Sequence, residues 1–166
     1  MFEPQTLLVD TNVIIEAVRT GCWRAITGRF VVETVEECTL EAKRGEADRS
    51  GYVVVSDNDI SRLALIHIVS EEQRAALVLE YPDASGMDPG ERDLFAHARS
   101  RADETWVILS PDKASVRAAV RLGWPDRIRS LGALIQSTGT RPSQKLKRQF
   151  EEAWLVEWRT HFMLDG

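Results

Sequence analysis

The sequence predicts an α/β protein in which a mostly parallel central sheet lies between two layers of helices. Short apolar runs such as 7–9 and 106–109 are bounded by turn or polar residues, as buried parallel strands are. Segments with helical spacing and capping residues alternate with these runs. Because strands that alternate with helices usually pair in parallel, we expect a three-layer α/β/α sandwich.

The individual elements follow from apolar runs, caps and turn residues. Strands are predicted at 6–9, 28–32, 52–55 and 106–109. Helices are predicted at 13–19, 34–45, 70–79, 88–98, 113–122 and 143–162, with a short strand and a helix start inside 128–135. Residues 63–69 are apolar but fit helix and strand equally well, so their structure stays open. Glycine or proline follows several of these helices, as helix ends require.

The chain of 166 residues suits one main domain with an added C-terminal helix. We expect this domain over 1–140 and a helical extension over 141–166. In the extension, Phe150, Trp154, Trp158 and Phe162 recur every four residues and form one apolar stripe. Such a stripe must dock on the domain or on a partner.

Composition is that of an ordinary globular protein, with 43% hydrophobic and 28% charged residues and a net charge of −5. The charge is uneven, because residues 1–112 carry a net −10 and residues 113–148 a net +8. A basic segment permits a polyanionic partner, although a solvated helix face is the commoner explanation. No apolar run reaches the roughly 18 residues of a membrane span, and the N-terminus lacks a signal peptide's basic region. We expect a cytoplasmic protein with no membrane partner.

Acidic residues lie where two predicted strands end. Asp10 directly follows the first strand, and Asp112 closes Leu-Ser-Pro-Asp after the strand at 106–109. The carboxyl ends of parallel strands share one edge of a sheet, so these two acids can meet there. Glu37 and Glu91 each lie in the first turn or two of a helix that can start on the same edge. Taken alone, Asp10 fits a turn acid and helix cap equally well.

Four carboxylates at one edge would repel each other unless a cation neutralised them. Ligation by carboxylate oxygens alone, without histidine or cysteine, favours Mg²⁺ or Mn²⁺ over Zn²⁺. Such ions suit phosphodiester cleavage, where they activate water and stabilise developing negative charge. Cys22 and Cys38 have no metal-ligand spacing and are expected to pack as small apolar groups.

Several of these motifs resemble the PIN-domain ribonucleases, including the toxins of VapBC-type toxin–antitoxin pairs. LLVDTNVII is similar to the opening strand and D-T-N motif of that family. PGERDLFAHA resembles its G-E-x-x-x-x-A-x-A motif, and ILSPDK resembles its strand-end [ST]-x-D motif. RAAVRLG followed by SLGALI resembles the closing helices. The resemblance covers roughly residues 5–137.

The resemblance implies a Mg²⁺- or Mn²⁺-dependent endoribonuclease with RNA as substrate. It implies four catalytic acids, of which the first, third and fourth hold the metal: Asp10, Glu37, Glu91 and Asp112. Asn12, Ser110 and Asp93 would support them, and Lys113 and Arg117 would contact substrate phosphates. An antitoxin partner and a homodimer are also implied for a toxin.

Two of these assignments have rivals in the sequence. The second acid could be Glu33, Glu36 or Glu41, although Glu37 fits the family spacing best and Glu36 comes next. Asp93 competes with Glu91, which is preferred because it puts Ala96 and Ala98 at the small positions of the motif.

Two other functions compete with the nuclease. One is a catalytically silent PIN-fold module that binds RNA or protein. The other is a phosphoaspartate enzyme, against which Asn12 argues because haloacid-dehalogenase phosphatases carry D-x-D at this point. His67, His97 and His161 lack partners at ligand spacing and are expected to be structural or exposed to solvent.

Overall fold

Four parallel strands form the central sheet of the computed structural model, which describes residues 6–44 and 53–166. Their order across the sheet is β3 (Leu65–His67), β2 (Val31–Val35), β1 (Thr6–Val9) and β4 (Val107–Leu109). In β1, Leu8 lies opposite Glu33 of β2 and Ile108 of β4. A further parallel bridge joins Ile108 to Ile128 beyond β4. The predicted parallel sheet is confirmed.

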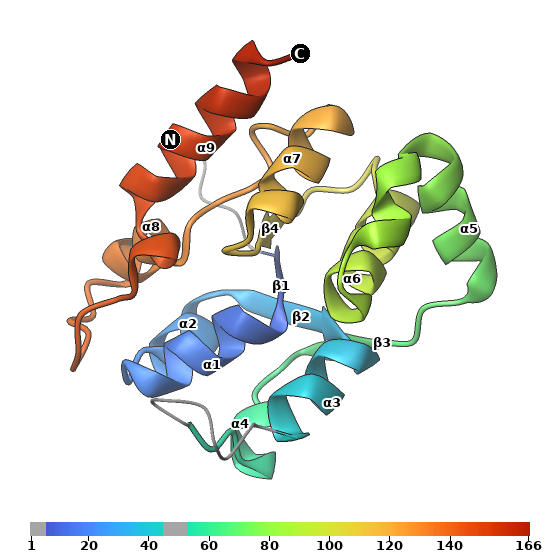
Figure 1. Cartoon of the computed structure of the whole chain (residues 1–166). Coiled ribbons are helices and arrows are strands. Elements are labelled where there is room, and N and C mark those ends of the chain that lie inside the picture. The colour runs from blue at the N-terminus through green and yellow to red at the C-terminus, as the bar shows by residue number, and fades with distance from the viewer. Residues whose placement is uncertain (1–5, 45–52) are drawn as a thin grey trace.

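Helices cover both faces of this sheet, which confirms the predicted α/β/α sandwich (Figure 1). Leu7 and Val9 point to one face, where they pack with α1 (Thr11–Arg19), α2 (Trp23–Arg29) and α8 (Leu131–Thr138). Leu8 and Val35 point to the other face, beneath α5 (Glu71–Glu80), α6 (Pro89–Ser100) and α7 (Lys113–Arg121). Successive strand residues face opposite sides, so β1, β2 and β4 each contribute to both cores.

Helix α3 (Glu36–Arg44) follows β2 directly and packs against both α1 and α6. Its position brings an acidic helix to the edge where the strands end. The remaining elements are the short helix α4 (Asp57–Ile60) and the 3₁₀ turns η1 (Pro82–Gly86) and η2 (Arg148–Phe150). Ser56 and Ser70 close capping boxes at the starts of α4 and α5.

Three local predictions were wrong. Residues 53–55 of the predicted strand 52–55 have no regular structure, and residue 52 lies outside the described residues. The third strand is instead β3, in the segment that the sequence left open. Helix α2 was not predicted. The helix predicted at 34–45 begins only at Glu36, because Thr34 lies within β2, where its hydroxyl donates to the carbonyl of Val9 at 2.6 Å and joins β2 to β1.

The C-terminal extension docks on the body of the protein. Its helix, α9 (Glu152–Leu164), begins at Glu152 and not near residue 143. The preceding segment is held on α1, where the buried Glu16 carboxylate accepts from the Lys147 amide at 2.7 Å. Trp154 and Leu155 are buried in the core that α7 helps to form, and α9 runs beside α7 (Figure 1). None of the described helices is long and apolar enough to cross a membrane.

Candidate functional site

The strand ends place Asp10 and Asp112 at the same edge of the sheet. Asp10 continues β1, and its amide donates to the carbonyl of Leu109 at the end of β4 at 3.1 Å. Asp112 is the N-cap of α7, and its Oδ1 accepts from the amide of Ala114 at 2.7 Å. Each acid is therefore fixed by a strand end and a helix start, as the sequence predicted.

Asp10 is a buried carboxylate with an unsatisfied oxygen. Its residue is 2% exposed, and Oδ2 has no hydrogen-bond partner. The pKa of Asp10 is raised to about 7, mainly by burial and also by the charges of Glu41 and Asp112, while the amides of Thr11 and Asn12 act in the opposite direction. A buried acceptor without a donor is costly, so this oxygen is suited to accept a cation or a hydrogen-bond donor.

Glu91 faces Asp10 from the first turn of α6. Burial raises the pKa of Glu91 to about 9, and the charges of Asp10, Asp112, Asp88 and Glu41 all act in the same direction. Within residues 6–44 and 53–166, no lysine, arginine or histidine forms an ion pair with Glu91 or Asp10. The two groups thus share an acidic pocket, defined here as Asp10, Glu41, Glu91 and Asp112.

The acid that α3 contributes to this pocket is Glu41, not the predicted Glu37. One oxygen of Glu41 accepts from the Thr11 hydroxyl at 2.9 Å, and the other accepts from the Gly90 amide at 3.1 Å. Thr11 and Gly90 adjoin Asp10 and Glu91 in the chain. Glu37 lies one turn earlier on α3, half-buried, and has no such contact. Glu37 and Glu41 lie four residues apart on one face of α3, so no spacing in the sequence could have selected between them.

Gly90 leaves room for the Glu41 carboxylate beside the first turn of α6. A Cβ at this position would lie 2.8 Å from both carboxylate oxygens of Glu41. Any other residue would therefore push the carboxylate away or lose the hydrogen bond from its own amide. The glycine of the Pro-Gly-Glu sequence thus has a physical role, because it lets Glu41 lie beside Glu91.

Asp93, the rival of Glu91, lies outside the acidic pocket. Its carboxylate is held by Arg74 of α5, whose Nε and Nη2 donate at 2.9 and 3.0 Å. Arg92 approaches the same carboxylate at 3.4 Å. The structure therefore favours Glu91 for the pocket and gives Asp93 a structural ion pair.

The other two predicted supporting residues, Asn12 and Ser110, are placed differently from Asp93 and from each other. The Asn12 side chain is exposed, on the first turn of α1 beside Asp10. Ser110 is buried, and its hydroxyl donates to Ser115 at 2.9 Å, which ties the end of β4 to α7. Neither side chain has a hydrogen bond to one of the four acids among the described residues.

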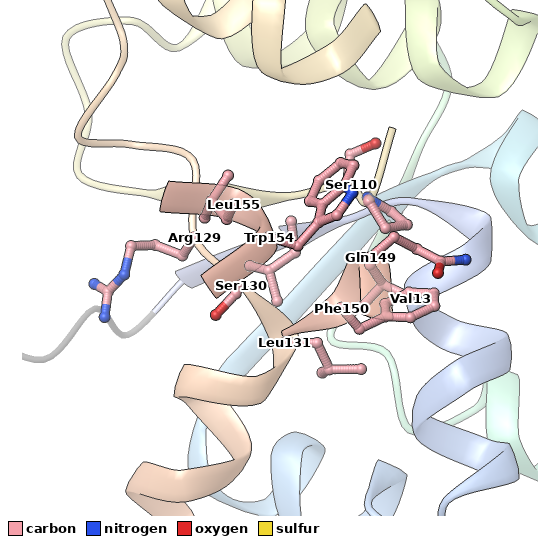
Figure 2. A pocket seen from close by; sticks show the side chains of 11 residues that line it. Val13, Ser110, Arg129, Ser130, Leu131, Gln149, Phe150, Trp154 and Leu155 are labelled. Atoms are coloured by element: carbon pink, nitrogen blue, oxygen red, sulfur yellow. The ribbon is translucent and has the colours of Figure 1, made fainter. Parts of the chain in front are cut away.

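Ser110 also lines a small hollow between the end of β4 and the C-terminal extension (Figure 2). Phe150, Trp154 and Leu155 of the extension gather on one side of it, and Leu131 of α8 lies below them. None of its lining residues is acidic, so the hollow is separate from the acidic pocket. Because Phe150 and Trp154 are buried here, they belong to the core and do not form a surface for stacking bases.

The two predicted phosphate-binding residues have other contacts. The ammonium of Lys113 lies 3.9 Å from the ring centre of Trp158 on α9. Arg117 pairs with Asp83 at 3.2 Å, with both side chains largely exposed. Exposed pairs of this kind are weak, so both cations can exchange these partners for a phosphate.

Taken together, the pocket is a set of oxygen ligands with excess negative charge. Two of its acids are buried with raised pKa values, and one oxygen has no donor. Carboxylate oxygens are the ligand type that Mg²⁺ and Mn²⁺ prefer, although among the described residues the group whose ligand atoms lie within 4.8 Å of one another is Glu33, His67 and His97. No protein-family model, curated protein or solved structure matches the chain.

Proposed function

We propose that the protein is a Mg²⁺- or Mn²⁺-dependent endoribonuclease whose acidic pocket cleaves RNA phosphodiester bonds. The observation that carries the proposal is the pair of buried acids without a cation, Asp10 and Glu91. Perturbed titratable groups that meet at the carboxyl edge of a parallel sheet are typical of active sites. The PIN-like motifs of the sequence supply RNA as the substrate.

Asp10, Glu91 and Asp112 would hold the metal, and Glu41 would orient Asp10 and Glu91 through Thr11 and Gly90. A divalent ion at such a site polarises the phosphate and activates the attacking water. The chain's own contribution is to fix the carboxylates on strand ends and helix starts. Lys113 and Arg117, on the first turns of α7 after Asp112, would receive the phosphates on either side of the scissile bond.

The resemblance also supports narrower proposals about partners. We propose that the enzyme acts as the toxin of a toxin–antitoxin pair, with an antitoxin that covers the acidic pocket. A second copy of the chain would complete the functional form. These proposals depend on the nuclease activity and are tested after it.

An RNase assay with Mn²⁺ tests the proposal directly. The wild-type protein should cleave single-stranded RNA, Asp10→Asn and Glu91→Gln should not, and EDTA should stop the reaction. Glu72→Gln, which removes an exposed acid of α5, is the matched control and should cleave like the wild type. Equal cleavage by the wild type and Asp10→Asn would refute the assignment. RNA binding without cleavage would instead favour the catalytically silent module.

A further inference from the structure

A second group of potential metal ligands lies where β2, β3 and α6 meet, away from the acidic pocket. Glu33 of β2, His67 of β3 and His97 of α6 each offer one ligand atom, and these atoms lie within 4.8 Å of one another. Glu33 and His97 are buried, and His67 is half-buried. His97 lies six residues along α6 from Glu91, about 9 Å at the rise of an α-helix. This Glu–His–His cluster is therefore a separate site.

The geometry of the cluster is compact. The imidazole rings of His67 and His97 stack with their centres 3.8 Å apart and an interplanar angle of 20°. Nε2 of His67 lies 2.6 Å from Oε1 of Glu33. Two imidazole nitrogens and one carboxylate oxygen form a donor set that binds Zn²⁺ and similar transition metals. The all-oxygen acidic pocket, in contrast, suits Mg²⁺ or Mn²⁺.

In this cluster the positive charge is supplied by the guanidinium of Arg101. Its Nη1 donates to Oε1 of Glu33 at 2.7 Å and lies 3.2 Å from Nε2 of His97. The same guanidinium also contacts Glu104 at 3.2 Å, and its side chain is 19% exposed. Arg101 can therefore turn towards Glu104 and solvent while the ligand atoms stay in place.

The imidazole of His97 is suited to ligation at neutral pH. Burial, together with the charges of His67 and Arg101, lowers the pKa of His97 to about 4. Its ring is thus neutral, and Nε2 carries a lone pair that Arg101 now occupies as a hydrogen-bond donor. Glu33 is ionised, because its hydrogen bonds from His67 and Arg101 keep its pKa low against the effect of burial.

We propose that Glu33, His67 and His97 form a transition-metal site, selective for Zn²⁺ over Mg²⁺, which the Arg101 guanidinium closes when no metal is bound. Binding would exchange one cation for another. It would join β2, β3 and α6 through the metal, and β3 is a short edge strand with few other ties. The site does not depend on the proposed nuclease activity.

Equilibrium dialysis of the full chain against Zn²⁺ tests the site. The wild type should bind one ion, and His67→Gln and His97→Gln should each weaken binding by at least about tenfold, the scale on which even supporting contacts of a metal site act. His161→Gln is the matched control, because it removes the third histidine of the chain from the exposed face of α9. Equal affinities of His97→Gln and His161→Gln would overturn the proposal, as would a wild type that binds no Zn²⁺.

Arg101→Gln provides a test that misfolding cannot imitate. Removing the competing cation should tighten Zn²⁺ binding, whereas a purely structural cluster would gain no affinity. Co²⁺ substitution should add visible absorption bands that His97→Gln loses. Asp10→Asn should keep the Zn²⁺ site while losing RNA cleavage, so failure of this proposal and failure of the nuclease proposal are told apart. Unchanged or weaker Zn²⁺ binding by Arg101→Gln would overturn the role of Arg101.

Discussion

Helix α6 carries two buried acids two residues apart, and their electrostatic environments are opposite. Asp93 faces Arg74, which donates two hydrogen bonds to its carboxylate. Glu91 faces Asp10, Glu41 and Asp112, all of the same charge. Positions two apart on a helix point about 200° away from each other, so one helix serves both environments.

The comparison extends to the rest of the protein. Buried Glu16 pairs with Arg19 at 2.7 Å, and buried Glu33 pairs with Arg101 at the same distance. The fold therefore supplies arginines for buried acids wherever structure alone requires it. Asp10 and Glu91 have no such arginine partner among the described residues, and this lowers the stability of the folded protein. A loss of this kind is typical of a site that binds a ligand.

The largest expected effect on the free energy of unfolding comes from breaking the ion pair between Arg74 and the buried Asp93 carboxylate. Arg74→Gln leaves the Asp93 carboxylate buried with only the longer contact from Arg92. We expect a loss of about 3 kcal/mol in the free energy of unfolding, the lower end for a broken buried pair. Urea denaturation measures it. The double variant Arg74→Met/Asp93→Leu should recover most of the loss, because both charges are then removed, and a double variant as unstable as Arg74→Gln would contradict the explanation.

Asp10 and Glu91, which have no ion-pair partner among the described residues, should make the metal-free protein less stable as the pH rises. The pKa of Glu91 is raised from 4.5 to about 9, so above pH 4.5 the folded state binds more protons than the unfolded state. Stability therefore falls as the pH rises between these two values. Asp10 adds to the fall up to about pH 7. Denaturation in EDTA across this range measures the slope.

Glu91→Gln is the control for this slope, because glutamine fills the same space without a charge. It should flatten most of the pH dependence and stabilise the protein at alkaline pH. The matched acids behave in the opposite sense: the lowered pKa values of Glu16 and Glu33 mean that their stabilisation disappears on acidification. A wild type whose stability rises with pH through this range would contradict the unmatched state of Glu91.

Mn²⁺ should remove the cost of the unmatched acids. At about a hundred times its dissociation constant, Mn²⁺ should stabilise the wild type by about 2.7 kcal/mol through binding to the folded state alone. Asp10→Asn should be more stable than the wild type in EDTA and gain little from Mn²⁺. Thermal unfolding with and without the ion shows both effects. If Asp10→Asn gained as much as the wild type, the ion would bind elsewhere.

The parts of the fold that follow from local pattern were predictable. The apolar runs of β1 and β4 end in Asp10 and close to Asp112, and parallel pairing placed both acids at one edge. Strand β3 was not predictable, because Leu65 and Ile66 are exposed and the segment lacks the alternation of a half-buried strand. The run 53–55 has strong β propensity but no strand beside it, so tertiary pairing decided against propensity.

The sequence predicted that four acids lie together at this edge, but it did not identify all four of them. Glu91 and Asp93 lie on different faces of α6, and the small residues that follow selected Glu91, which is the one that the charges of Asp10 and Asp112 act on. The choice on α3 failed because spacing alone does not say which turn of the helix lies beside α6. Contact with Gly90 decides it, and that contact is between residues 49 positions apart.

The smallest expected effect separates Glu41 from Glu37. Glu41→Gln should weaken Mn²⁺ binding about tenfold, or about 1.4 kcal/mol, because it removes charge from the pocket and loosens the hold on Thr11 and Gly90. Glu37→Gln removes the same charge one turn away and should change the affinity less than twofold, on the order of 0.4 kcal/mol. Calorimetric titration of both variants with Mn²⁺ measures the difference.

The two variants have equal net charge, so a general electrostatic effect of α3 would weaken Mn²⁺ binding equally in both. Contact with the pocket would weaken it in Glu41→Gln alone. A larger loss in Glu37→Gln would restore the acid that the family spacing selects. That result would require α3 to turn about its axis, which the hydrogen bond from the Gly90 amide to Glu41 opposes. The glycine therefore links the identity of the second acid to the packing of α3 on α6.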